Sequence, residues 1–276
     1  MPSISQALYE LEQKQEPAAL CTVVSSQGST PRHVGSKMLV YENGSFIGTV
    51  GGGDLEHRVL DEACSALADG QARLLSYNMS DPSRGDPGVC GGQVEVFVEP
   101  ILPAPLLVVI GAGHVGKAVV HLAKWLGFRV AVSDDRAEFC TPESVPGADA
   151  YHPVPMGQLA EQLKITRRTF IVITSRGSSV DAEGLPPLLA SPAAYIGVIG
   201  SRRRWATTVK ALKKKGVSEK QIERVHSPMG LELNAETPEE IAVSILAEVL
   251  MLRDGGTGKT MKLEKAVREK TPTASG

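Results

Sequence analysis

The sequence predicts an α/β protein, in which an N-terminal α+β domain precedes a Rossmann-type domain built on a parallel sheet. Two observations lead to this prediction. From Leu106 onward, short apolar segments typical of buried strands alternate with helical segments, and this order indicates right-handed βαβ crossovers. Just before that point, residues 99–105 contain three prolines and form the expected linker. We therefore expect domains at 1–100 and 106–253, with a flexible tail rich in Gly, Lys and Thr at 254–276.

Composition and charge indicate a globular protein and exclude some classes of partner. The 276 residues suffice for two domains of about 100–150 residues, and a hydrophobic content of 42% supports buried cores. A formal net charge of −2 gives no general attraction to nucleic acid or to anionic membranes. No apolar segment reaches the roughly 20 residues that a membrane span needs, and no signal-peptide core is present. We expect a cytoplasmic protein with no nucleic-acid or membrane partner.

The N-terminal domain should contain two helices and five strands. Asn43-Gly44 separates two apolar segments, which favours a hairpin closed by a type I′ turn. Periodic apolar residues indicate the helices, and β-branched or alternating segments indicate the strands. The expected helices cover 5–14 and 54–68, and the expected strands cover 18–25, 37–41, 46–50, 73–77 and 93–98.

The C-terminal domain should alternate five strands with helices. Its last helix is expected to begin at Pro238, because Thr237 is a favourable N-cap, proline is preferred in the first turn, and two acids follow. The expected strands cover 106–110, 130–133, 150–152, 169–174 and 195–199.

A Gly-x-Gly-x-x-Gly pattern follows the first of these strands and opens a helix, the context that makes such a pattern informative. Gly111 permits a tight turn, Gly113 lets the backbone approach a pyrophosphate, and Gly116 allows close helix–strand packing. Asp134 or Asp135, at the end of the next strand, stands where an acid binds ribose in dinucleotide-binding folds. The alternative is a chain that keeps the fold while nucleotide binding has been lost or altered.

A second glycine-rich loop lies in the N-terminal domain. Gly51, Gly52 and Gly53 precede a helix and are able to direct backbone N–H groups at an anion. Arg32, in an earlier polar loop, adds positive charge and favours phosphate as that anion. The alternative is a strained turn in which Asp54 simply caps the helix.

Cys90 lies between glycines in a loop rich in Asp, Pro and Gly, so its thiol is expected to be accessible. A thiolate here is able to act as a nucleophile, a sulfur carrier or a ligand of a soft metal. The alternative is a small residue that fills a turn. Cys21, Cys64 and Cys140 lie in apolar or helical segments and are expected to be ordinary buried thiols.

Two further loops follow strands at the carboxyl edge of the predicted parallel sheet, where α/β folds bind ligands. They contain residues 175–178 and 197–204. In the second loop, Ser201 is expected to cap a helix over an anion. Arg202 follows it, and positive charge in the first turn of a helix is unfavourable unless an anion compensates. The alternative is a solvated helix start.

Several of these segments, taken in order, resemble the XdhC/CoxI family of xanthine dehydrogenase accessory factors. Because the motifs are distinct and ordered, the resemblance is more specific than the glycine pattern alone. It spans roughly residues 17–250. The matching segments are 28–32, 48–56 and 89–92 in the N-terminal domain, and the Rossmann segment, 195–202, 226–231 and 235–242 in the C-terminal domain.

The resemblance implies a maturation protein, a cofactor chaperone rather than a catalyst. Such a protein binds molybdenum cofactor, promotes its sulfuration by a partner sulfurtransferase (a cysteine desulfurase), and passes it to a client molybdenum hydroxylase. A homodimer is expected, because it is the commonest assembly of soluble chains. One residue departs from the family pattern: relatives commonly carry His where this chain has Ser178, so no role of that imidazole is transferred.

The residue patterns and the resemblance combine into one hypothesis for the sites. Cys90 faces the molybdenum, and Arg32 with the Gly51–Gly53 loop holds the pterin or its phosphate. The Rossmann loop takes a nucleotide moiety, NAD(P) or another. Two rival functions are an NAD(P)-dependent oxidoreductase, for which His114 and Asp134 form no convincing acid–base pair, and a non-enzymatic nucleotide or redox sensor.

Overall fold

The computed structural model describes residues 3–28, 30, 32–78 and 92–262. The chain forms two compact units, Met1–Ala104 and Pro105–Gly276. None of the helices in the described ranges combines the length and the apolar character of a membrane span.

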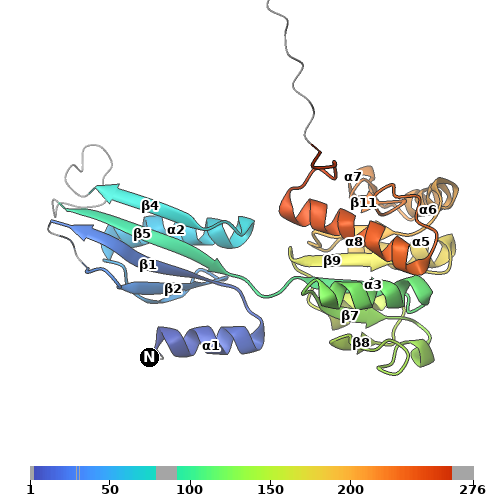
Figure 1. The fold of residues 1–276 in the computed structure, drawn as a ribbon, viewed down its shortest axis with the longest axis horizontal. Helices are drawn as coiled ribbons and strands as arrows, with labels where there is room; N and C mark the ends of the chain where they lie inside the picture. The colour runs from blue at the N-terminus through green and yellow to red at the C-terminus, as the bar shows by residue number, and fades with distance from the viewer. Residues whose placement is uncertain (1–2, 29, 31, 79–91, 263–276) are drawn as a thin grey trace, which may run out of the picture. The chain divides into compact units, whose positions relative to one another are not determined.

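Over its described residues, the N-terminal unit is a five-stranded antiparallel sheet with two helices, and its strands are ordered β3-β2-β1-β5-β4; Figure 1 labels the last four of them. Its elements are α1 (Ile4–Lys14), β1 (Ala18–Gln27), β2 (Lys37–Tyr41), β3 (Phe46–Gly48), α2 (Gly53–Asp69), β4 (Arg73–Asn78) and β5 (Gln93–Ile101). The predicted helices and strands of this region are present, with ends shifted by a few residues.

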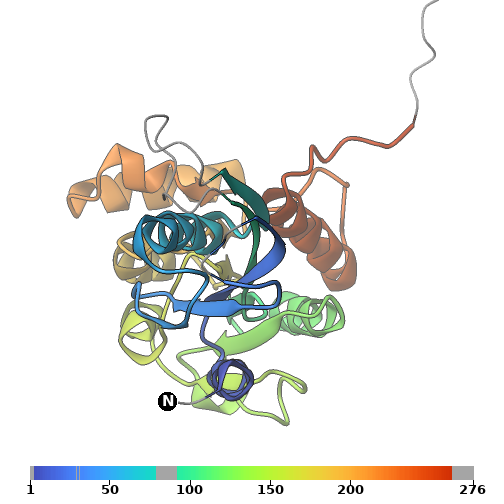
Figure 2. The ribbon, with the colours of Figure 1, turned by 90° about the vertical axis from the view of Figure 1, so that its left-hand side faces the viewer.

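The two helices of this unit cover opposite faces of the sheet, as Figure 2 shows. Successive strand residues point to opposite faces, so Ala19 packs in the α2 cluster while Ala18 packs in the α1 cluster. The α2 cluster is the larger and includes Leu55 and Val59 of the helix, both almost fully buried. Each such side chain contributes about 1.5–3 kcal/mol of hydrophobic stabilisation.

The hairpin between β2 and β3 is confirmed, but the predicted turn type is wrong. In this loop only Gly44 has a positive φ (80°), whereas a type I′ turn needs positive φ at both central residues. Tyr41 accepts a hydrogen bond from the Gly44 N–H at 2.9 Å and donates one to the Ser45 carbonyl at 2.8 Å. The result is a three-residue loop that ends in a left-handed glycine, which also joins twisted strands well.

The linker is shorter than predicted. Strand β5 continues to Ile101, which pairs with Ala18, and Pro100 pairs with Ala19. Proline is tolerated here because β4 begins beside Val98, so Pro100 has a strand on one side only. Only the segment between Ile101 and Leu106 lies outside the sheets.

The C-terminal unit is a six-stranded parallel sheet ordered β11-β10-β9-β6-β7-β8, which confirms the predicted fold class. Its strands are β6 (Leu106–Ile110), β7 (Arg129–Ser133), β8 (Ala150–His152), β9 (Thr169–Ile173), β10 (Tyr195–Val198) and β11 (Val225–His226). Its helices are α3 (His114–Trp125), η2 (Ala137–Phe139), η3 (Met156–Gln158), α4 (Leu159–Gln162), α5 (Ser178–Leu189), α6 (Arg202–Lys214), α7 (Glu219–Ile222) and α8 (Pro238–Asp254).

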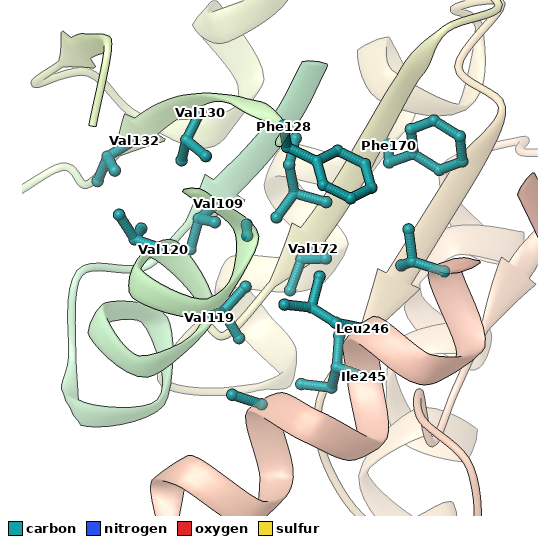
Figure 3. Close-up of a cluster of buried hydrophobic side chains, with 14 of the residues drawn as sticks. Val109, Val119, Val120, Phe128, Val130, Val132, Phe170, Val172, Ile245 and Leu246 are labelled. Atoms are coloured by element: carbon teal, nitrogen blue, oxygen red, sulfur yellow. The ribbon is translucent and has the colours of Figure 1, made fainter. Parts of the chain in front are cut away.

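Both faces of this sheet are buried. On one face, Val109 packs with Val119 and Val120 of α3 and with Leu246 of α8 (Figure 3). Its neighbour Val108 belongs to the cluster on the other face, which contains buried leucines of α5 and α6. Burial on both faces explains why these strands are continuous apolar segments in the sequence.

The strand order fixes where a ligand is able to bind. From β6 the chain adds β7 and β8 on one side, and then returns to add β9, β10 and β11 on the other. The order therefore reverses between β6 and β9, whose ends Ile110 and Ile173 are paired. In open α/β sheets, the crevice beyond the strand ends at such a reversal is the usual ligand site.

Candidate functional site

The glycine-rich loop lies at this reversal point, and each of its three glycines has a separate role. Gly111 has a φ of 109°, and an added Cβ would lie 2.7 Å from the Thr174 carbonyl oxygen. At Gly116 an added Cβ would lie only 1.9 Å from the Gly111 carbonyl oxygen, so α3 packs directly on the loop. Gly113 is the N-cap of α3, and no described atom lies within 4 Å of an added Cβ there. A ligand is therefore able to reach the backbone at Gly113.

Asp134 anchors this loop to the end of β7. Its buried carboxylate accepts hydrogen bonds from the Ala112 N–H at 2.8 Å and from the N–H, Nε and Nη2 of Arg136 at 2.9–3.0 Å. Burial acts to raise the pKa of Asp134, but these hydrogen bonds outweigh it and hold the pKa below its ordinary value. To bind Asp134, a ribose hydroxyl would therefore have to compete with these N–H donors for the carboxylate. The neighbouring Asp135 is exposed and pairs with Arg176 at 2.7 Å.

Two cavities lie beside the loop, and both include Thr174 and Ser175 at the end of β9. The first, of about 290 Å³, extends over the ends of β7 and β8. The second, of about 360 Å³, extends over the start of α3 and the end of β10. The second is lined by Gly113, His114, Val115, Gly116, Thr174, Ser175, Ile199, Gly200 and Arg204.

One arginine of α6, the helix that follows β10, lines the second cavity. It is not the arginine that the sequence predicted. Ser201 caps α6 by accepting the Arg204 N–H at 3.3 Å, as predicted. Arg202 is exposed and is not among the residues that line the cavity. Arg204 does line it, and its guanidinium pairs with the fully buried Asp181 at 2.8 Å. The sequence contained one signal for this Arg204–Asp181 pair: an acid in the first turn of α5 and an arginine in the first turn of α6.

In the N-terminal unit, the predicted glycine loop has a backbone that only glycine adopts easily. Gly51, Gly52 and Gly53 have φ values of 155°, 84° and 61°. Gly52 is the N-cap of α2, and Asp54 forms an ion pair with Arg58 at 3.0 Å instead of capping the helix. The capping role considered for Asp54 is therefore wrong. Two acids in the first turn of α2 already interact favourably with the positive end of the helix dipole. Their negative charge weakens the case for an anion at this loop.

Strand register places neighbouring pairs of the predicted N-terminal loops side by side, at two separate places along the sheet. Gln27, the last residue of β1, pairs with Gln93, the first residue of β5, and Gln93 pairs with Asn78 at the end of β4. The segment that begins after Gln27 carries Arg32, which is exposed. The start of β2 likewise pairs with the end of β3, where the glycine loop begins. Cys90 itself lies outside the described residues.

The other cysteines only partly match expectation. Cys21 and Cys140 are buried, as predicted, and burial raises the pKa of the Cys21 thiol to about 12. Cys64 is exposed on α2, so the prediction of a buried thiol there is wrong. Within the described ranges, no three His, Cys, Asp or Glu side chains are grouped as metal ligands.

The N-terminal unit is an antiparallel sheet, and the C-terminal unit is a parallel sheet with a glycine-rich loop at its reversal point. Together they define a two-unit protein with a Rossmann-type domain. Family comparison gives the finer assignment. The XdhC Rossmann domain family matches residues 107–249, and the XdhC and CoxI family matches residues 11–78. The chain belongs to the XdhC/CoxI family, which confirms the resemblance seen in the sequence.

Three curated relatives are similar over most of this chain. Uncharacterized protein YqeB of Escherichia coli is 39% identical over 257 residues, which are 91% of this chain; the chain spans 46% of that relative's length. A Bacillus subtilis protein named as a probable xanthine dehydrogenase component is 26% identical over 89% of this chain and 96% of its own length. The molybdenum cofactor insertion chaperone PaoD of Escherichia coli is 24% identical over 86% and 83%. A solved structure described as a xanthine dehydrogenase from Bacillus halodurans is 23% identical over 91% of this chain and 95% of that one, with a TM-score of 0.49.

Proposed function

We propose that this chain is a maturation factor that binds molybdenum cofactor and delivers it to a xanthine dehydrogenase-type molybdenum hydroxylase. The observation that carries the proposal is the presence of both family domains, in order, in one chain. The relatives named as an insertion chaperone and as a xanthine dehydrogenase component support it. Its partners are the client hydroxylase and a cysteine desulfurase that sulfurates the bound cofactor. It acts in the cytoplasm as a homodimer.

We assign the molybdenum and pterin end of the cofactor to the N-terminal unit. Bound cofactor supplies the redox-active, dithiolene-held metal that the client uses. In this chain Cys90 contacts the metal end, while Arg32 and the Gly51–Gly53 loop hold the pterin. Three features support the fit: the paired exit points of the Arg32 and Cys90 loops from the sheet, the open space beside Gly52 and Gly53, and the exposure of Arg32. The acids of α2 favour the pterin, which has N–H donors, over a phosphate at this loop.

The C-terminal unit holds the phosphate or nucleotide part of the ligand. The open backbone at Gly113 and the cavity beyond it support this assignment, because a helix N-terminus is a ready site for phosphate. NAD(P) is the alternative ligand of this loop. Tight NAD(P) binding without any retention of pterin would favour the rival oxidoreductase or sensor.

The proposal is tested by cofactor retention and transfer. The purified chain is incubated with released molybdenum cofactor and desalted, and molybdenum and oxidised pterin are assayed. The loaded chain is then mixed with cofactor-free xanthine dehydrogenase. We expect both components to elute with the chain near one equivalent, and the activity of the client to rise. If neither molybdenum nor pterin is retained, while NAD or NADP binds in a parallel titration, the proposal is wrong.

The site assignment predicts that Cys90→Ala and Gly52→Val lower retention by roughly tenfold or more, because one loses a soft ligand and the other strains a backbone at φ 84°. Cys64→Ala, which removes an exposed thiol elsewhere in the same unit, is the matched control and should retain the cofactor normally. Equal retention by all three variants would remove Cys90 and the glycine loop from the site.

A further inference from the structure

The two cavities of the C-terminal unit differ sharply in charge. Five charged residues line the first, three of them acidic: Asp134, Asp135, Arg136, Arg176 and Glu183. The described residues that line the second include no acid, and Arg204 is their one permanently charged side chain. Arg136 and Arg176 pair with Asp134 and Asp135, so Glu183 leaves the first cavity with a net negative charge, whereas Arg204 of the second cavity is balanced by Asp181. An anionic group of a ligand that lies across the glycine loop is therefore opposed in the first cavity and not in the second.

The Arg204 guanidinium is held in one orientation by buried partners. Its Nε and Nη2 donate to the Asp181 carboxylate at 3.1 and 2.8 Å, and Nη2 also donates to the carbonyl and hydroxyl oxygens of Ser175 at 3.1 and 2.7 Å. The Ser175 hydroxyl donates to the other Asp181 oxygen. Within the described part of the chain, Nη1 has no hydrogen-bond partner. Two of the three nitrogens thus fix the group, and the third is left to bind a ligand of the cavity that Arg204 lines.

The backbone is also shaped around this arginine. Gly200 has a φ of 137°, and an added Cβ would lie 2.7 Å from Arg204 Cδ. The absence of a side chain at Gly200 lets the arginine stem lie across the end of β10 toward Asp181. Across the cavity, α3 begins at Gly113 without a side-chain cap among the described residues, so the N–H groups of its first turn remain available as donors.

We propose that the second cavity binds a phosphate or pyrophosphate group, and that Arg204 is the residue that recognises it. Asp181 and Ser175 act as positioning residues. The inference rests on the proposed function, in which this unit holds the phosphate-bearing part of the cofactor. Arginine suits the task, because Nε and Nη2 hold the planar guanidinium against Asp181 and Ser175 while Nη1 keeps its two N–H groups as donors for phosphate oxygens. A buried Asp–Arg pair by itself stabilises a fold only weakly, whereas an oriented guanidinium specifies a ligand.

Titration calorimetry with inorganic pyrophosphate, on the full chain, tests the inference. The parent should bind, and Arg204→Lys should bind roughly tenfold more weakly or worse, because lysine keeps the charge but its single nitrogen is unable to stay fixed on Asp181 and Ser175 and also donate to phosphate from a second nitrogen. Arg202→Lys, two residues away and exposed, is the matched control and should bind like the parent. The same affinity in the parent and in folded Arg204→Lys would overturn the inference.

A second measurement shows whether Arg204 contacts the ligand or only holds the structure. It uses the parent chain, so it does not require a variant to fold. In the parent, NMR signals of the Arg204 guanidinium should shift as pyrophosphate is added, and those of Arg202 should not. Unchanged Arg204 signals at saturation would overturn the assignment. A parent that retains molybdenum cofactor but does not bind pyrophosphate would overturn this inference alone. Arg204-dependent pyrophosphate binding without cofactor retention would leave it standing and remove the proposed function.

Discussion

At the scale of single residues, Gly116 shows how the absence of a side chain builds the site. We expect Gly116→Ala to destabilise the C-terminal unit by about 1–3 kcal/mol, because its Cβ would lie 1.9 Å from the Gly111 carbonyl oxygen and α3 would have to move away from the loop. Urea denaturation followed by circular dichroism measures this loss.

Gly113→Ala provides the contrast for that measurement. The added methyl group meets no described atom within 4 Å, so the loss of stability should stay below about 1 kcal/mol. Pyrophosphate binding should nevertheless weaken, since the methyl group occupies the open approach to the backbone. Similar stability losses for both alanine variants would contradict the separate roles of these two glycines.

Sequence patterns predicted some residues of the site and missed others for a physical reason. The spacing of Gly111, Gly113 and Gly116 is local, and the strand before it and the helix after it are visible in the sequence. The Arg204–Asp181 pair joins the first turns of two helices that are separated by β10. Which of three successive arginines points toward the cavity depends on the phase of α6 against the sheet, and this phase is set by tertiary packing.

At the scale of elements, Glu248 ties α8 to the β11 edge of the sheet. It accepts hydrogen bonds from the Tyr195 hydroxyl at 2.6 Å and from the Gly230 N–H at 2.7 Å, and its other oxygen lies 3.0 Å from His226 Nδ1. Burial acts to raise the pKa of Glu248, but the hydrogen bonds from His226, Tyr195 and Gly230 outweigh it and lower the pKa. These contacts join β10, β11 and the turn after β11 to one carboxylate.

This cluster predicts a specific dependence of stability on pH. Because the folded pKa of Glu248 is lowered, its contribution is fully present above the unfolded value of about 4.3 and is lost as pH falls through the folded pKa. Glu248→Gln should cost about 1–3 kcal/mol at pH 7, and its deficit against the parent should shrink as the pH falls below about 4. Urea unfolding at several pH values measures it.

Glu239→Gln is the control for that series, since Glu239 is exposed on the same helix. It should leave the unfolding free energy nearly unchanged across the same range. A deficit of Glu248→Gln that stays constant down to acid pH would mean that the ionised carboxylate is not what holds these elements together.

Elements were predictable where their own residues, or the elements around them, form a recognisable pattern. The segments that became β2, β6 and β8 were predicted with their observed ends. The short strand β11 was missed, because Val225 and His226 form a strand only by pairing with β10. The turn between β2 and β3 was misjudged for a similar reason: Asn-Gly is compatible with more than one loop, and strand register decides among them.

At the scale of the whole molecule, each unit has its own buried core. The clusters around α1 and α2 contain only residues of 1–104, and the clusters on the two faces of the parallel sheet contain only residues of 105–276. Two independent cores of this size predict two units that fold separately. Cutting the chain between them is therefore informative.

A protease recognition sequence inserted between Leu102 and Pro105 would allow this cut in the purified, cofactor-loaded chain. Both fragments should remain folded by circular dichroism, because the segment between β5 and β6 belongs to neither sheet. After separation, molybdenum and pterin should remain with the N-terminal fragment, which carries Cys90 and Arg32, while pyrophosphate binding should remain with the C-terminal fragment, which carries Arg204. Cofactor lost from both folded fragments would mean that retention needs the two units joined, and that neither unit is by itself the carrier.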